Sequence, residues 1–134
     1  MLRMNWMGFG ALALVGSAIA ADAPSPVQRQ VLYAEPLVNI PGKSLTAVLL
    51  DAAPGAASTA KHHHAGTVLV YVVAGTVRVQ FRGKAPETYR AGQCFTEPPG
   101  TEHLSTKNVS ATEPAKLLVV FVADTGAQLT TYDK

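Results

Sequence analysis

The chain has 134 residues, of which 48% are hydrophobic and 15% are charged. This length and composition fit one globular domain, and they exclude wholesale disorder and a multidomain assembly. Eleven basic and nine acidic residues give a net charge of +2, too small a bias to indicate a nucleic-acid-binding protein. The one cysteine, Cys94, excludes an intramolecular disulfide and a thiolate zinc cluster, and we expect its side chain to be buried.

Residues 1–20 have the pattern of a secretory signal peptide. An apolar run extends from Met7 to Ile19, and Ala18-Ile19-Ala20 fits the small-residue pattern that a signal peptidase reads. Because the run is shorter than the roughly 20 apolar residues that span a bilayer as a helix, an uncleaved anchor is the less favoured alternative. We expect cleavage after Ala20 and a periplasmic or secreted mature chain, residues 21–134, with no further membrane association.

The mature chain is predicted to be all-β. We interpret residues 21–44 as a lead-in, mobile and Pro-rich over residues 22–30, followed by a first strand, and residues 45–134 as a barrel. Short apolar or alternating segments recur between turn signals, and no helical pattern is found. Many short strands without helices are typical of an antiparallel sandwich or small barrel. The predicted strands are residues 45–50, 67–73, 76–82 and 116–123, with turns at 83–86 and 97–100.

Three of these segments carry specific expectations. Residues 76–82 alternate strictly, which predicts that Val77, Val79 and Phe81 point to one face. Ala74-Gly75 is interpreted as a two-residue hairpin connection between the strands on either side of it. The nearly continuous apolar run at residues 116–123 indicates a strand that is buried on both faces.

Three of the four histidines are consecutive, at His62-His63-His64, and the fourth is His103. In an extended segment, His62 and His64 point to the same face while His63 points away from it, toward solvent. Two imidazoles on one face are ready ligands for a divalent metal, and His103 on an adjacent strand would supply a third. The alternative is a solvated histidine run that binds metals only adventitiously.

The order of these residues resembles the first motif of the cupin superfamily. That motif runs from Gly through His-x-His and a later Glu to a closing Gly. Here His62-His63-His64 supplies the two histidines, and Gly75 stands at the closing glycine. The opening glycine is shifted, since Ala56 occupies its position and Gly55 precedes it. The motif glutamate is missing because Val68 stands in its place.

The second cupin motif is matched more fully. Gly92, Pro98-Pro99-Gly100 and His103 have the spacing of its Gly, Pro-x-Gly and His. Asn108 lies one residue beyond the expected asparagine, where Lys107 stands. Asn108 also begins a formal N-glycosylation acceptor, Asn-Val-Ser, which carries no meaning in a bacterial protein. The resemblance implies a double-stranded β-helix, the jelly-roll barrel of the cupins, with a metal held inside its mouth by the motif histidines.

The missing glutamate changes what the resemblance implies for the site. By strand parity, Val68 faces the same interior as His62 and His64, so no carboxylate comes from that position. Either the cavity binds an organic ligand without metal, or His62, His64 and His103 hold a divalent transition metal (Fe, Mn, Ni, Cu or Zn) alone. Glu97 is the nearest candidate for a replacement carboxylate or a catalytic base, the alternative being a solvated residue before the turn.

The sequence leaves three functions open. The first is a metal-dependent small-molecule enzyme of the dioxygenase type, because three-histidine cupins with this activity are known. The second is a non-catalytic barrel that binds a metal or a small ligand, and the third is a sugar or uronate isomerase or lyase. A metal on neutral imidazoles keeps its full charge, so we expect an anionic small-molecule ligand. Free strand edges in such barrels predict a homodimer.

Overall fold

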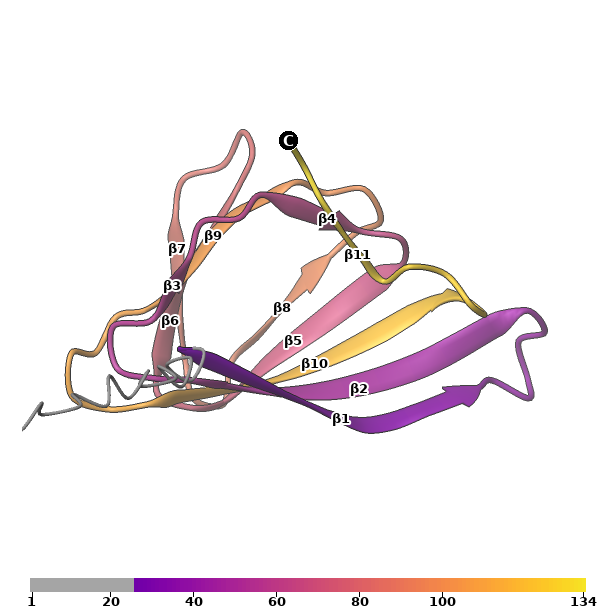
Figure 1. Cartoon of the computed structure of the whole chain (residues 1–134), viewed down its shortest axis with the longest axis horizontal. Helices are drawn as coiled ribbons and strands as arrows, with labels where there is room; N and C mark the ends of the chain where they lie inside the picture. The colour runs from indigo at the N-terminus through magenta and orange to yellow at the C-terminus, as the bar shows by residue number, and fades with distance from the viewer. Residues whose placement is uncertain (1–25) are drawn as a thin grey trace, which may run out of the picture.

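A computed structural model describes residues 26–134, and the signal-peptide prediction therefore lies outside the described residues. Within this range, eleven strands form two antiparallel sheets that face each other (Figure 1). Residues 26–134 contain no helix, and so none that is long and apolar enough to cross a membrane. The all-β class and the jelly-roll barrel predicted from the sequence are confirmed.

The first sheet has the order β1-β2-β10-β5-β8, and the second has the order β11-β4-β9-β6-β7, with β3 paired to β9. Apart from the consecutive pairs β1-β2 and β6-β7, neighbours in each sheet come from distant parts of the chain, as in a jelly roll. The strands of the first sheet are β1 (Val27–Pro36), β2 (Lys43–Ala52), β10 (Ala115–Asp124), β5 (Thr67–Ala74) and β8 (Cys94–Glu97). Those of the second are β3 (Ala57–Ser58), β4 (His62–His64), β6 (Thr76–Phe81), β7 (Glu87–Arg90), β9 (His103–Asn108) and β11 (Thr130–Tyr132).

The core lies between the two sheets and consists mainly of valine and phenylalanine. Strand β5 contributes every second residue to it, and strand β6 contributes Val77, Val79 and Phe81, as the alternation predicted. The prediction for residues 116–123 is wrong in one respect. Strand β10 alternates between buried and half-buried residues, so only its inner face is in the core, although it lies in the middle of its sheet.

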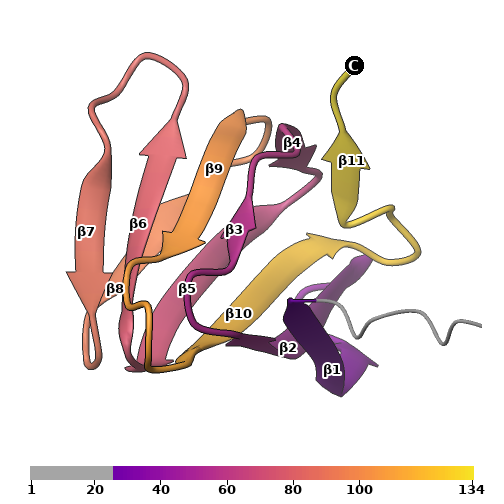
Figure 2. The same ribbon diagram turned by 60° about the vertical axis from the view of Figure 1, so that its left-hand side comes forward.

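The predicted hairpin at Ala74-Gly75 is also wrong. Strands β5 and β6 do not pair with each other: β5 pairs with β10 and β8, and β6 pairs with β9 and β7 (Figure 2). Gly75 is instead the corner at which the chain leaves one sheet and enters the other. Its φ of 78° is a conformation that side chains with a Cβ rarely adopt.

Two smaller expectations fail at the surface of the first sheet. Strand β1 begins at Val27, so part of the stretch expected to be a mobile lead-in pairs in register with β2. Cys94 is exposed rather than buried, because it stands opposite Tyr71 on the outer face of the sheet. The parity of β8 places Phe95 and Glu97, and not Cys94, on the inner face.

Asn108 is buried at the end of β9 opposite His103. Its side chain is 1% exposed, and its amide nitrogen donates hydrogen bonds to the carbonyl oxygens of Ala52, Ala53 and Glu113. Its side-chain oxygen accepts a hydrogen bond from the backbone N–H of Ser110. The motif asparagine, displaced by one residue in the sequence, therefore ties the end of β2 to the loop between β9 and β10, and it is not accessible for glycosylation in the folded chain.

Gly75 provides a test of the corner between the sheets. A Cβ at this position would lie 2.7 Å from the carbonyl oxygen of Pro114 and 2.9 Å from the Cα of Ala115. Gly83 has a similar φ of 77°, but nothing lies within 4 Å of its Cβ position. We expect Gly83→Ala to lower the free energy of unfolding by about 1 kcal/mol. Gly75→Ala should lower it by about 2–4 kcal/mol, because backbone atoms must also move.

Urea unfolding followed by circular dichroism measures both free energies. Equal losses in the two variants would show that the close approach of Pro114 contributes nothing at this corner.

Candidate metal centre

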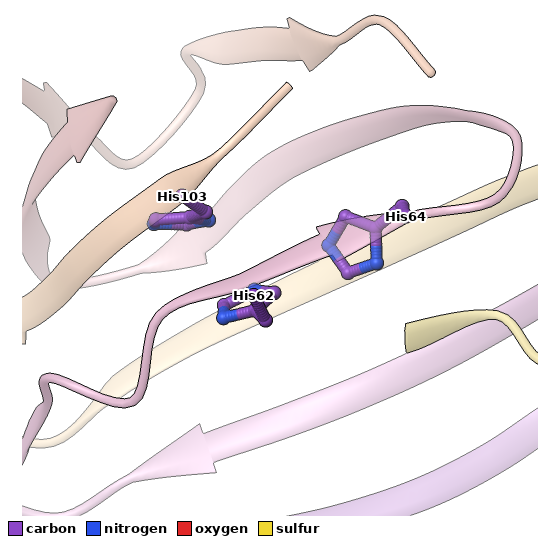
Figure 3. A group of neighbouring side chains, drawn as sticks. All are labelled: His62, His64 and His103. Atoms are coloured by element: carbon purple, nitrogen blue, oxygen red, sulfur yellow. The ribbon is translucent and has the colours of Figure 1, made fainter. Parts of the chain in front are cut away.

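The structure brings three histidines together at one end of the barrel. His62 and His64 lie on the same face of β4, and His62 stands directly opposite His103 on β9. The centroid of the His62 ring lies 4.7 Å from the centroid of His103 and 5.0 Å from that of His64. One nitrogen from each ring can be chosen so that all three lie within 4.8 Å of one another. The three rings surround a common space (Figure 3).

His63 points away from this group. Its Nδ1 lies 2.9 Å from the carboxylate of Asp133, close to the C-terminus, and its side chain is about one-third exposed (37%). It is therefore half-buried rather than fully in solvent. The pair holds the last residues of the chain against β4, since the backbone N–H of Asp133 also donates to the carbonyl of Lys61.

The rings of His62 and His64 are oriented through Nδ1 by backbone carbonyls. The Nδ1 of His62 lies 2.9 Å from the carbonyl oxygen of Ala60, and the Nδ1 of His64 lies 3.0 Å from that of Leu129. Since a carbonyl oxygen only accepts hydrogen bonds, each Nδ1 carries the proton and donates it. The lone pair of each ring is then on Nε2, which is the arrangement found when histidines ligate metals.

His103 is held at both ring nitrogens. Its Nε2 lies 3.0 Å from the carbonyl oxygen of Ser105 and 2.7 Å from the hydroxyl of Thr106, and its Nδ1 lies 3.2 Å from a carboxylate oxygen of Glu97. Because the Ser105 carbonyl can only accept, the proton of the neutral ring is on Nε2. The unprotonated nitrogen, Nδ1, then faces Glu97. In this tautomer the lone pair of Nδ1 is available to a cation that Glu97 would also attract.

Glu97 is buried beside the histidines. The residue is 2% exposed, and one carboxylate oxygen lies 3.5 Å from the Nε2 of His64 as well as 3.2 Å from His103. Its Cα pairs across the sheet with that of Val68, the position where the cupin motif has glutamate. Directly opposite residues on one face have Cβ atoms about 5 Å apart. A carboxylate therefore enters the same part of the interior from the neighbouring strand.

Burial controls the protonation of His64. Desolvation lowers the pKa of His64, and the positive charge that its two histidine neighbours can carry lowers it further. The hydrogen bond to Leu129 and the charge of Glu97 act in the opposite direction without reversing the shift. The neutral imidazole, which is the form that binds metals, is thus favoured at His64.

The histidines and Glu97 line a cavity of about 570 Å³ between the sheets. This volume lies within the range of small-molecule sites in proteins. The rest of the lining is largely apolar: it includes Val48, Leu50, Val70, Leu117, Val119 and Phe121. Residues of β1 and of β11 also line it, so the cavity extends to the side where the first strand and the last strand face each other.

The donor set fits a divalent transition metal. Three neutral imidazoles and one carboxylate are ligands of intermediate softness, which suit Fe, Mn, Ni, Cu or Zn more than Ca or Mg. The rings are oriented by hydrogen bonds from their other nitrogens, as metal-ligating histidines usually are. His62, His64 and His103 are therefore suited to hold a metal, although these donors do not select one ion among those named.

Comparison with known proteins identifies the family. Residues 48–121, more than half of the chain, match the family model described as the cupin domain. The chain belongs to the cupin family. No curated protein matches its sequence.

Several solved structures are similar to this chain in fold. A conserved protein with a double-stranded β-helix domain from Klebsiella pneumoniae has a TM-score of 0.64 at 21% identity, over 85% of this cupin and 90% of that chain. The DMSP lyase DddQ from Ruegeria pomeroyi also has a TM-score of 0.64 at 21% identity, over 90% and 58% of the two chains. Oxalate decarboxylase from Bacillus subtilis has a TM-score of 0.57 at 23% identity, over 68% of this cupin and 24% of that enzyme. At these identities the likeness concerns the fold.

Several residues of the site carry no signal in the sequence. Leu129 and Ala60 act through backbone carbonyl oxygens, which every residue possesses. Tyr132 lines the cavity 5.8 Å from the ring of His62, and only the pairing of β11 with β4 brings it there. Arg29 lines the cavity from β1, in a stretch where the sequence predicted no strand.

Proposed function

We propose that this cupin is a metal-dependent enzyme acting on a small anionic molecule. His62, His64 and His103 are the metal ligands, and Glu97 is the carboxylate at the centre. The observation that carries the proposal is the set of three oriented imidazoles within 4.8 Å at the buried end of an apolar cavity. Adventitious binding by the histidine run is disfavoured because His63 faces elsewhere and pairs with Asp133.

A bound metal would supply Lewis acidity and, for Fe, Mn or Cu, electrons for redox chemistry. The protein's own groups do the rest. Apolar residues around the cavity exclude water, which strengthens each electrostatic interaction inside. Glu97, at 2% exposure and in contact with His64 and His103, can hold or accept a proton next to the ligand. Three neutral imidazoles do not cancel the charge of the ion, and one carboxylate cancels only half, so an anionic ligand is favoured.

Two reaction types are candidates. A dioxygenase-type reaction is supported by the three-histidine ligand set, which leaves positions open around the ion. An isomerase or lyase reaction is supported by Glu97, because a buried carboxylate beside the ligand can abstract a proton. Two proteins of similar fold, an oxalate decarboxylase and a DMSP lyase, also act on small molecules. Oxygen consumption separates the types: a dioxygenase stops under anaerobic conditions, while an isomerase or lyase continues.

The ligand set predicts a specific pattern of metal content. His62→Ala, His64→Ala and His103→Ala should each lose most of the bound metal, because two imidazoles cannot hold an ion as firmly as three. His63→Ala should retain it, since that ring faces Asp133. The measurement is metal per chain by elemental analysis of protein purified without a histidine tag.

The His63 variant is the matched control, since it shortens the same run by one ring. Equal loss in all four variants would mean adventitious chelation. If His103→Ala retained its metal, or if the unmodified protein contained none, the remaining function would be non-catalytic ligand binding by the barrel.

The pairing of Val68 with Glu97 predicts that the carboxylate can be moved between strands. Glu97→Gln should weaken Zn²⁺ binding by about 10- to 100-fold, in the range seen when groups around a metal site are altered. Adding Val68→Glu should restore much of the affinity, because the two side chains start about 5 Å apart on one face. Competition with a chromophoric chelator measures the affinity, and circular dichroism checks that each variant folds.

Glu35→Gln makes the same charge change on the exposed strand β1 and should leave the affinity unaltered. An affinity of Glu97→Gln equal to that of Glu35→Gln would remove Glu97 from the metal centre. A folded double variant that binds no better than Glu97→Gln would refute the exchange of positions.

We also propose that the protein is exported and that two mature chains associate. Export is supported by the apolar run and Ala18-Ile19-Ala20. Association is supported by β1, a ten-residue strand at the free edge of its sheet. At its centre Val31, Leu32 and Tyr33 are each more than half exposed, and no charge protects this stretch. The partner is a second copy, whose β1 pairs antiparallel across a two-fold axis.

Native mass spectrometry tests export and association together. Protein recovered outside the cytoplasm should have the mass of two chains, each of residues 21–134. Chains that retain residues 1–20 would contradict cleavage, and single chains at micromolar concentration would contradict the dimer. Leu32→Lys should convert the dimer to single chains, because a charge at the free edge opposes pairing.

A further inference from the structure

The cavity carries a basic side chain far from the histidines. Among the residues between 26 and 134 that line it, Arg29 is the one arginine or lysine and Glu97 is the one carboxylate. Glu97 lies at the buried end, against His64 and His103, whereas Arg29 is exposed. The cavity therefore has a buried carboxylate beside the histidines and an exposed guanidinium on β1, with apolar residues lining the rest of its walls.

Strand pairing places Arg29 on the inner face of its sheet. Arg29 stands opposite Leu50 of β2, and Leu50 stands opposite Leu117 of β10. Both leucines line the cavity, and residues directly opposite in an antiparallel sheet share a face. The residue two positions earlier on that face, Val27, also lines the cavity. An arginine thus occupies a row that is otherwise apolar.

Arg29 is free to bind a ligand. None of the ion pairs formed within residues 26–134 includes it. Its guanidinium is planar and carries five N–H donors, which match the two oxygens of a carboxylate in parallel hydrogen bonds. An exposed guanidinium that lines the cavity, with no ion pair to any of residues 26–134, therefore forms an anion-binding group on the side of the cavity away from the histidines.

The register also gives the length of the apolar stretch between the two ends. Phe121 packs against His64, with ring centroids 5.2 Å apart, and so marks the histidine end of the cavity. Leu117, in the same row as Arg29, is four residues away on the same strand. At about 3.3 Å per residue, the two rows lie roughly 13 Å apart. Val119 lies between them and faces the cavity.

We infer that Arg29 binds the carboxylate of an elongated, otherwise apolar ligand. The apolar chain lies along Leu117, Val119 and Phe121, and the opposite end of the ligand reaches the histidines. The ligand class is thus an elongated aliphatic or arylalkyl carboxylate. The orientation of the ligand toward a metal rests on the proposed function, whereas the contact with Arg29 does not.

The probe is 6-phenylhexanoate, whose neutral counterpart is 6-phenylhexanamide. Calorimetric titration of metal-free protein should give tighter binding of the carboxylate than of the amide. Arg29→Gln should weaken carboxylate binding about tenfold, as expected for a hydrogen-bonded charge at a partly exposed site, and should leave amide binding unchanged. Arg29→Lys should recover part of the affinity, since it keeps the charge but loses the planar fork.

Arg78→Gln is the matched control. Arg78 is exposed on β6, does not line the cavity, and its replacement makes the same change in net charge. Equal weakening in the Arg29 and Arg78 variants would overturn the inference, because it would reduce the effect to overall charge. Absence of carboxylate binding at millimolar concentration, or equal weakening of amide and carboxylate by Arg29→Gln, would also overturn it.

Repeating the titration with His64→Ala and with zinc-loaded protein separates this inference from the proposed function. If the metal site is wrong but the subsite is right, carboxylate binding still depends on Arg29 in both backgrounds. If the carboxylate binds at the metal instead, zinc-loaded protein binds the probe, Arg29→Gln has no effect, and metal-free protein does not bind it. That result would overturn the subsite and leave the metal centre intact.

Discussion

The candidate site depends on how a strand of three residues, β4, is held in place. On one side β4 pairs with β9 through His62 and His103, and on the other side it pairs with β11. The backbone N–H of Gly100 donates to the carbonyl of His64, which also ties β4 to the turn after Glu97. Because a strand of three residues has little stability of its own, these neighbours set its position. The geometry of two of the three imidazoles follows from that position.

Much of the fold and of the histidine cluster could be predicted from local pattern. The alternation of residues 76–82 and the opposite directions of His62 and His63 follow from the two-residue period of a strand, which neighbours along the chain reveal. The corner at Gly75 could not be predicted in this way, because a two-residue link looks the same in a hairpin and in a change of sheet. The pairing of β5 with β10 and of β6 with β9 decides between them, and it involves segments distant in sequence.

Glu97 illustrates the same limit at the site. Along the chain it only precedes a Pro-Pro-Gly turn, where a solvated carboxylate is equally compatible with the sequence. Its burial follows from pairing with β5, which sets Glu97 opposite Val68. A barrel interior can receive a side chain of a given kind from either of two adjacent strands. The absence of a carboxylate from one motif position therefore does not mean that the interior has none.

The C-terminal residues do more than complete the second sheet. The carbonyl of Leu129 accepts the Nδ1 proton of His64, and the carboxylate of Asp133 accepts that of His63. Proteolysis before Leu129 would free both rings, and His64 could then place its proton on Nε2, the nitrogen that would otherwise carry the lone pair. The tail and the site are thus linked thermodynamically. A ligand that needs the Nδ1-protonated tautomer of His64 also stabilises the docked tail, and the docked tail strengthens binding of that ligand by the same free energy.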